Sequence, residues 1–298
     1  PTCTFTDGSG AREDTSVTYT TSNPDSHIAS VTVHNDDNDG AVGFSCTYSD
    51  LAGNAIASAI TTASSGAVTI DNTHPTSSAA TIAVSGSGNA NDADVITLTL
   101  DPSETVGTPV CTWTDGSGAM EDTSVTYATV GGTDHHTAAV TVHNDDDDGA
   151  VGFSCTYTDS AGNAIATAIT SLSAGSAITI DNTHPTSTTA VLAVTGSGNG
   201  NDADVVSITL DPSETVGTPT CTFTDGSGAM EDTSVTYTTS GDDTHIASVT
   251  VHNDDDDGAV GFSCTYTDSA GNAIASAITS ASSGSVTIDN THPTSTTA

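Results

Sequence analysis

One stretch of this 298-residue chain occurs three times almost unchanged, at residues 40–56, 149–165 and 258–274. In the middle copy Val151, Phe153, Cys155 and Tyr157 alternate with small or polar residues. Alternation of this kind places one face of a strand in a core and leaves the other face toward solvent. The Asp-x-Ala-Gly-Asn that follows predicts a tight turn, because Gly tolerates a positive φ and Asp and Asn bond the local backbone. Each copy is therefore predicted to be a half-buried antiparallel strand ending in a turn.

The repeat has a period close to 109 residues, which is the size of a domain. The cysteines recur 108 to 110 residues apart, and so does the motif Asp-Asn-Thr-His-Pro, which we interpret as a linker. With the linker as boundary, the chain divides into a partial first unit (residues 1–72), a second unit (73–182), a third unit (183–290) and the start of another (291–298).

The first unit matches only the part of a repeat that begins at Pro109 or Pro219, and it lacks counterparts of the strands predicted near 79–84 and 95–100. Two interpretations follow. The chain is a window of a longer tandem array, or a neighbouring chain supplies the missing strands, as in donor-strand assembly. The window is favoured, because the last eight residues do not contain enough sequence to replace both strands.

The second unit has seven short apolar-alternating segments separated by turn residues, and no segment has a helical period. We expect strands near 80–84, 95–100, 109–115, 124–129, 138–142, within the repeated stretch, and in 165–180 with a break near Gly175. Seven short strands in about 110 residues predict a two-sheet sandwich. The fold class is therefore all-β, with tandem immunoglobulin-like sandwiches.

Three motifs together carry a resemblance to a known group. They are the Ser-Glu turn at Ser103-Glu104 and Ser213-Glu214, the Tyr-Thr-Asp-Ser-Ala-Gly-Asn turn, and the closing Thr-Ile-Asp-Asn-Thr-His-Pro. The chain resembles the bacterial immunoglobulin-like (Big-type) tandem repeats of large prokaryotic surface adhesins and surface-layer or filament proteins. The resemblance implies an extracellular, non-catalytic array whose junctions are often stiffened by calcium. The cysteine pair and the extreme acidity depart from that pattern.

Each unit carries two cysteines, 43 or 44 residues apart. Their regular placement predicts the disulfides Cys3–Cys46, Cys111–Cys155 and Cys221–Cys264, because both partners lie on inward faces of neighbouring strands. Closing a loop of this size stabilises each unit by roughly 3 to 4 kcal/mol in the chain-entropy account. Buried free thiols and zinc ligation are the alternatives, although no Cys-x-x-Cys or histidine cluster accompanies the pairs. Disulfides predict a location outside the cytoplasm.

The chain contains 38 acidic residues and one basic residue, giving a net charge of −37. This field repels nucleic acid and anionic membranes and attracts cations. Adaptation to saline surroundings and specific cation binding both explain it, and the two are compatible. No run of apolar residues is long enough to span a bilayer, so no membrane insertion is expected in this segment.

An acidic loop before each repeated stretch is the first candidate calcium site. Asn144, Asp146 and Asp148 alternate before Gly149, like the first half of many calcium loops, in which alternate side-chain oxygens converge. The corresponding residues are Asn35, Asp37 and Asp39 in the first unit and Asn253, Asp255 and Asp257 in the third. The alternative is that an Asp-rich hairpin tip is simply solvated.

The junction between units is the second candidate calcium site. We expect three kinds of carboxylate to meet there: those of the linker, the glutamates of the Ser-Glu turns and the aspartates that open the repeated turns. Calcium bound to them would make a flexible junction rigid. These residues are Asp71, Asp181, Asp289, Glu104, Glu214, Asp50, Asp159 and Asp268. The alternative is that the linker prolines, Pro75 and Pro185, stiffen the junction unaided.

The chain is predicted to be no enzyme, because it has no Gly-x-Ser-x-Gly elbow and no phosphate-binding loop between a strand and a helix. The predicted function is a structural segment of a long extracellular filament or adhesin on a prokaryotic cell, whose partners are further copies of the repeat and cations. The alternative is a surface-layer or sheath protein whose acidic surface collects cations.

Overall fold

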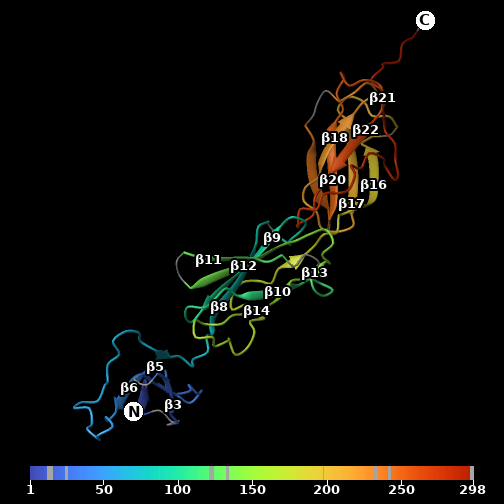
Figure 1. Ribbon diagram of the computed structural model, residues 1–298. Helices are drawn as coiled ribbons and strands as arrows, with labels where there is room; N and C mark the ends of the chain where they lie inside the picture. Colours follow the sequence, from blue (N-terminus) through green and yellow to red (C-terminus); the bar gives the residue numbers. More distant parts are fainter. Residues whose placement is uncertain are drawn as a thin grey trace.

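A computed structural model describes residues 1–11, 16–23, 26–86, 88–120, 124–131, 134–196, 198–230, 234–240 and 243–295. The regular secondary structure of these residues is entirely β-strand. Three bodies follow one another along an elongated molecule, with the two termini at opposite ends (Figure 1). Within the described part, no helix has the length and apolar character needed to cross a membrane.

The second unit is a sandwich of two antiparallel sheets. One sheet has the order β11-β12-β9-β8, and the opposite sheet contains β10 and β14, with Ile169 forming a further bridge to Cys155. The strands are β8 (Ser77–Val84), β9 (Val95–Pro102), β10 (Val110–Thr114), β11 (Thr126–Val130), β12 (His135–Thr141), β13 (Gly149–Ala150), β14 (Gly152–Thr156) and β15 (Thr179–Ile180). This is the strand order of a constant-type immunoglobulin sandwich, in which the first, second, fifth and fourth strands form one sheet and the third, sixth and seventh form the other.

The third unit repeats the same arrangement, with sheets β16-β17-β20-β19 and β18-β22. Its strands are β16 (Ser187–Val194), β17 (Val205–Pro212), β18 (Thr220–Thr224), β19 (Thr236–Ser240), β20 (Thr244–Thr250), β21 (Gly258–Ala259), β22 (Gly261–Thr265) and β23 (Thr287–Ile288). The predicted all-β, immunoglobulin-like fold is confirmed.

The first unit has fewer strands. They are β1 (Thr2–Asp7), β2 (Gly10–Ala11), β3 (Thr18–Asn23), β4 (Ser26–Ser30), β5 (Gly40–Ala41), β6 (Gly43–Thr47) and β7 (Thr69–Ile70). The described residues of this unit contain no strands that correspond to β8 and β9, and among them β4 pairs only with β3.

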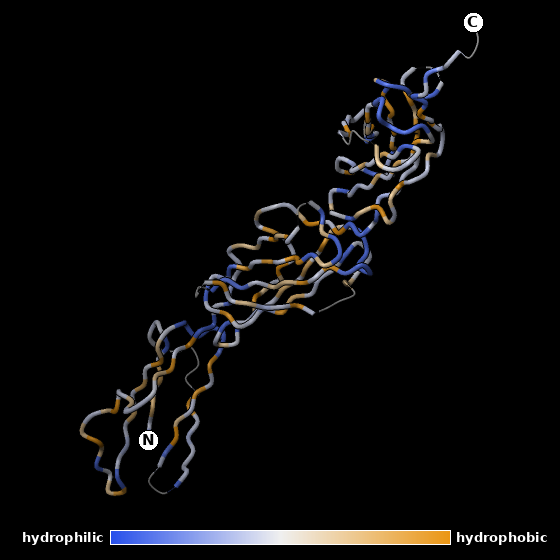
Figure 2. Tube along the Cα trace, turned by 90° about the horizontal axis from the view of Figure 1, so that it is seen from above, coloured by the Kyte–Doolittle hydropathy of each residue, from blue (hydrophilic) through white to orange (hydrophobic). Residues whose placement is uncertain are grey.

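The cores of the second and third units form as the alternation predicts. Ile96, Leu98 and Leu100 of β9 are fully buried, and Val151, Phe153, Cys155 and Tyr157 of the repeated stretch face them. Figure 2 shows apolar and polar residues alternating along the strands. Burying side chains of this size stabilises a unit by about 1.5 to 3 kcal/mol each.

The predicted seventh strand is present only as two short pieces. Ile169 forms a bridge with Cys155, and β15 begins ten residues later. Gly175 between them has a φ of 93°, a conformation that interrupts a strand and favours glycine.

Each disulfide joins adjacent strands of one sheet. The pairs are Cys3–Cys46, Cys111–Cys155 and Cys221–Cys264. Cys111 lies directly opposite Cys155, whose backbone N–H and C=O both bond Ile169 on its other side. The cysteines therefore occupy a non-hydrogen-bonded position of their ladder, where Cα atoms lie close together. This placement differs from antibody domains, whose disulfide connects the two sheets.

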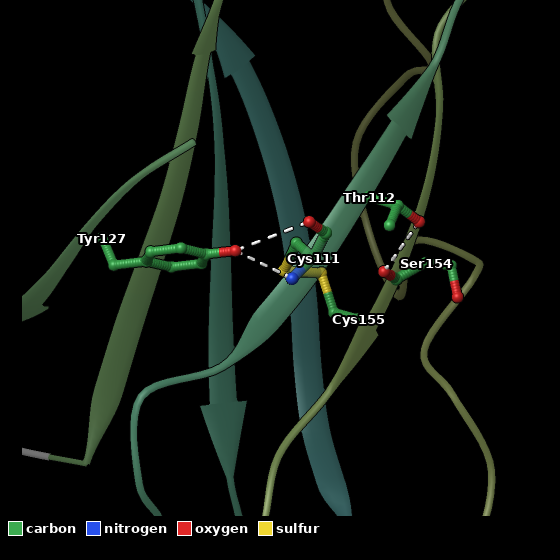
Figure 3. The surroundings of a disulfide bond; sticks show 5 residues. All are labelled: Cys111, Thr112, Tyr127, Ser154 and Cys155. Atoms are coloured by element: carbon green, nitrogen blue, oxygen red, sulfur yellow. Dashed lines mark hydrogen bonds between the residues drawn. A yellow bond between two sulfur atoms is a disulfide. The ribbon is translucent and has the colours of Figure 1, made fainter. Parts of the chain in front are cut away.

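A tyrosine from the opposite sheet supports each disulfide (Figure 3). The Tyr127 hydroxyl accepts a hydrogen bond from the Cys111 N–H (2.9 Å) and donates one to the Cys111 carbonyl (3.5 Å). Tyr19 and Tyr237 do the same for Cys3 and Cys221. The hydroxyl thus replaces the strand neighbour that the outer edge of β10 lacks at this position.

We predict that Tyr127→Phe lowers the stability of the second unit by about 1 to 3 kcal/mol, because it leaves the Cys111 N–H without an acceptor. Urea unfolding, together with hydrogen exchange of residues 110–114, measures the change. Tyr237→Phe is the matched control and should affect residues 220–224 instead. Unchanged exchange of the 110–114 amides in Tyr127→Phe would contradict the assignment.

Candidate metal centre

The central aspartate of each acidic loop accepts a hydrogen bond from the loop's own backbone. Asp146 is 3% exposed, and its carboxylate accepts the N–H of His143 at 2.8 Å. Asp37 and Asp255 hold His34 and His252 in the same way. The first residue of each predicted pattern, Asn35, Asn144 or Asn253, is exposed.

The last aspartate of each loop holds the linker. Asp148 accepts the N–H of Asn182 at 2.6 Å and the hydroxyl of Thr183. The Asn182 side chain donates back to the carbonyls of His143 (2.9 Å) and Asp146 (3.0 Å). The same bonds recur in the other units, between Asp39 and Asn72–Thr73 and between Asp257 and Asn290–Thr291. The loop therefore clamps the start of the linker.

In the second unit, the acidic loop and the start of the linker line an open depression together with Gly116 and Ser117. Two of the three side chains in the predicted calcium pattern already accept hydrogen bonds from protein donors, and a cation would compete with those donors for the same oxygens. Calcium binding at this loop stays a prediction.

A second set of buried aspartates was not among the residues predicted from the sequence. Asp115 is 8% exposed and accepts the N–H groups of Ser117 (2.9 Å), Gly118 (3.0 Å) and Asp147 (3.0 Å). Asp225 and Asp7 occupy the corresponding positions. The signal was available in the Asp-Gly-Ser-Gly motif, in which an aspartate side chain turns back on the following amides.

Burial alone would raise the pKa of Asp115, but the amide donors outweigh burial and lower it. The same balance lowers the pKa of Asp225. In Asp7, bonds from the Asn38 and Ser9 amides lower the pKa strongly. Hydrogen bonds to the charged form of a carboxylate have this effect.

The carboxylates predicted to meet at the junctions do lie together. Asp71, Glu104 and Asp159 each place an oxygen within 4.8 Å of the others, and Asp181, Glu214 and Asp268 repeat the arrangement. In the part of the chain that the structure describes, these are the two groups of three such side chains close enough to share a metal ion. Each group joins a linker residue to two residues of the following unit.

Local backbone pairing sets this geometry. Ser103 and Thr76 exchange hydrogen bonds just after the linker, through the Ser103 N–H to the Thr76 carbonyl (2.8 Å) and the Thr76 N–H to the Ser103 hydroxyl (3.0 Å). Glu104 follows directly. Val106 then forms an antiparallel bridge with Asp159, so the Ser-Glu turn and the repeated turn lie beside the same linker.

The two glutamates lack the compensation that the aspartates have. Burial is the largest cause that raises the pKa of Glu104, followed by the negative charges of Asp71, Asp159 and Asp39. Burial is likewise the largest cause that raises the pKa of Glu214, followed by the negative charges of Asp181, Asp268 and Asp148. By contrast, bonds from Asn163, Gly162 and Ala161 to Asp159 outweigh its burial and lower its pKa. Negative charge at each junction is therefore only partly balanced by protein donors.

Direct bonds also join each linker to the sandwich that follows it. Asn163 of the second unit donates through Nδ2 to the Asp71 carbonyl (2.9 Å), and Nδ1 of His74 lies 2.7 Å from the carbonyl oxygen of Ala164. Because a carbonyl only accepts, the His74 Nδ1 carries the proton. Asn272 and His184 make the same two contacts with Asp181 and Ala273, at 2.7 and 2.8 Å.

The second junction has an additional contact from a loop of the second unit. The Asn91 side chain donates to the Asn272 side-chain oxygen at 3.2 Å. Gly88 approaches the carbonyl of Ser269 so closely that a Cβ would collide with it, and its φ of 97° also favours glycine.

The remaining carboxylates predicted for the junctions, Asp50 and Asp289, belong to neither group. Asp50 caps its own turn by accepting the N–H groups of Ala52 and Asn54, and Asp289 accepts the N–H of Thr291. The linker prolines Pro75 and Pro185 are buried, so a contribution from proline to junction stiffness is compatible with these contacts.

No family model matches the chain, and no curated protein matches it. Solved structures with a similar arrangement include domains A168–A170 of titin, at 13% identity over 92% of this chain and 85% of that one, with a TM-score of 0.34. A tetra-tandem repeat from the extending region of a large adhesion protein is 20% identical over 95% of this chain and 66% of that one (TM-score 0.29). The mouse nectin-like molecule 4 ectodomain is 10% identical over 94% and 88% (TM-score 0.29). These similarities concern the fold alone.

We predict that Asp115→Asn destabilises the second unit at neutral pH, because the amide nitrogen of asparagine would face an N–H donor. A carboxylate with a lowered pKa contributes stability above its unfolded pKa and loses that stability as pH falls through its folded pKa. The difference in Tm from the unmodified chain should be constant from pH 7 to about 5 and should narrow below about pH 4.

Calorimetry across this pH range measures the effect. Asp92→Asn, at an exposed loop residue, is the control for the loss of one negative charge. A Tm difference for Asp115→Asn that does not change with pH would contradict the role given to the ionised carboxylate.

Proposed function

We propose that this chain is a non-enzymatic structural segment of a long extracellular filament or adhesin, built from tandem immunoglobulin-like repeats on a prokaryotic cell surface. The observation that carries the proposal is the linker, which is hydrogen-bonded to the unit before it and to the unit after it. Such a linker transmits force and orientation, whereas an unbonded linker would act as a hinge.

The bonds at the second junction support this proposal. Asp148 and the Asn182 side chain hold the linker against the second unit. One residue earlier, the carbonyl of Asp181 accepts a bond from Asn272 of the third unit, and His184 bonds Ala273. The linker between the two sandwiches is thus hydrogen-bonded to both of them.

The side chains most suited to chemistry have structural tasks, which supports a role without catalysis. The buried aspartates bond backbone amides, and the linker histidines bond carbonyls of the next unit. The disulfides support a location in an oxidising compartment outside the cytoplasm.

Calcium at the two junction groups forms part of this proposal. Three carboxylates offer the hard oxygen ligands that Ca²⁺ prefers. The chain contains no lysine and a single arginine, Arg12, so the second and third units have no lysine or arginine to neutralise these groups. Asp71, Glu104 and Asp159 would hold one ion, and Asp181, Glu214 and Asp268 the other, each ion linking two units.

Small-angle X-ray scattering of the full chain in calcium and in chelator tests the proposal. We expect a stiff, extended profile in calcium and a smaller radius of gyration in chelator, because repulsion between uncompensated carboxylates then loosens each junction. Glu104→Gln/Glu214→Gln should respond less to calcium. Identical profiles of the unmodified chain in calcium and chelator would refute the role of calcium.

A matched control separates the junctions from the acidic loops. Asn144→Ser/Asn253→Ser changes the first residue of the loop pattern in the second and third units and leaves the junction carboxylates intact. Its calcium response should equal that of the unmodified chain. If this variant loses the response and the glutamate variant keeps it, calcium binds the loops instead.

A surface-layer or sheath protein is the second candidate, favoured by the acidic loops that all three units expose. Negative-stain imaging distinguishes the two functions. Separate threads support the filament, and an ordered two-dimensional lattice that forms with divalent cations supports the sheath.

A further inference from the structure

The second unit is joined to its two linkers through strands at opposite ends of its sequence. One linker leads into β8, and the other leaves from β15 at Asp181. The two linkers leave the sandwich at opposite ends (Figure 1). A load carried along the units therefore reaches the second unit through β8 on one side and β15 on the other.

Two hydrogen-bonded patches hold these two parts of the chain together. At the first patch, the Ser173 hydroxyl accepts the Ala80 N–H (2.9 Å) and donates to the Ala80 carbonyl (3.0 Å), and the Ser173 N–H donates to the same carbonyl (2.9 Å). At the second patch, the Ala90 N–H donates to the Thr179 carbonyl and the Asp181 N–H donates to the Ala90 carbonyl, both at 2.8 Å. The patches thus connect the segment after the first linker to the segment before the second.

The segments joined by these patches run in the same direction. Residue 80 is bonded to residue 173, residue 90 lies opposite residue 180, and the Ala90–Ile180 bridge is parallel. The first linker pulls its segment toward the N-terminus, and the second linker pulls its segment toward the C-terminus. Between parallel segments such a load acts along the strands, so the bonds of a patch must break together. Bonds of an antiparallel hairpin pulled apart at its open end would break one after another.

The third unit repeats both patches at the equivalent residues and extends the first one. There the Leu192 N–H also donates to the Ser283 carbonyl at 3.1 Å. The next residue, Gly284, lies so close to the Leu192 carbonyl that a Cβ would collide with it, whereas a Cβ at the corresponding Gly175 would meet nothing within 4 Å. The first patch is therefore longer and closer in the third unit.

The disulfide of the second unit lies outside both patches. Cys111 and Cys155 are 44 residues apart in the sequence, and the patches involve only residues before the first cysteine and after the second. When the patches break, the pull passes through the disulfide and the loop between the cysteines is not extended. At roughly 3.3 to 3.6 Å per residue, this loop withholds about 150 Å of length.

We propose that the two parallel patches set the force at which each complete unit opens, and that the disulfide limits the length that the unit then releases. The third unit, with the longer first patch, opens at the higher force. This inference rests on the proposed function, in which tandem units carry load. It makes each unit an element that yields by a fixed step and keeps its reserve of length closed by a covalent bond.

Single-molecule force spectroscopy of the full chain in chelator tests the patches. Ser173→Ala removes the hydroxyl that bonds both backbone groups of Ala80. We expect it to make the second unit open about tenfold faster at constant force, with the third unit unchanged. Ser282→Ala should accelerate the third unit alone. In the unmodified chain, the event that Ser282→Ala accelerates should be the slower of the two.

Thr112→Val is the matched control. It removes a hydroxyl bond to the Ser154 carbonyl (3.5 Å) inside the disulfide loop, so it should change neither opening rate. Equal acceleration by Thr112→Val, or unchanged rates in both Ser173→Ala and Ser282→Ala, would overturn the role of the patches.

A reductant tests the limit set by the disulfide. Cys155 is fully buried in the folded unit, so the reductant reaches the disulfide only after the unit opens. Each opening of the second or third unit should then be followed by a further extension of about 150 Å. Openings without this extension in reductant, or with it in oxidising buffer, would overturn the limit. All of these measurements use the purified chain, so their failure would leave the scattering and imaging tests of the filament unaffected.

Discussion

Charge balance without cationic side chains is the constraint on which this structure depends. With 38 acidic residues and one arginine, ion pairs with lysine or arginine cannot neutralise the buried carboxylates. Burying an unpaired charge is costly, so the carboxylates bond backbone amides. Asp115, Asp146 and Asp159 each show this arrangement within one unit, and it recurs at every repeat.

Use of backbone amides as the partners of aspartate has a mechanical consequence. Amide donors are most available in turns and linkers, where no strand pairs with the backbone. Asp148 therefore fixes the linker at Asn182, and the side chain of Asn272 fixes the preceding residue, Asp181, to the following unit. The glutamates at the junctions remain the carboxylates with raised pKa values, which is why we place the cations there.

Alternation and spacing predicted the sandwiches, the inward faces and the disulfides, because these depend on periodicity within a strand. The junction groups were predicted from residue types beside the linker, and the structure places six of those carboxylates in two groups of three. The bonds of Tyr127, Asn182 and Asn272 were not predicted, because each joins segments 16 to 91 residues apart. Local pattern carries no information about contacts of that kind.

Carbon-detected NMR titration of the side-chain carboxyl groups, with and without calcium, tests the central claim most directly. The account predicts two classes. Asp115 and Asp225 titrate below the range of an exposed aspartate and do not respond to calcium, whereas Glu104 and Glu214 titrate above the range of an exposed glutamate until calcium lowers their pKa values. Glutamates that titrate as exposed side chains in both conditions would contradict it.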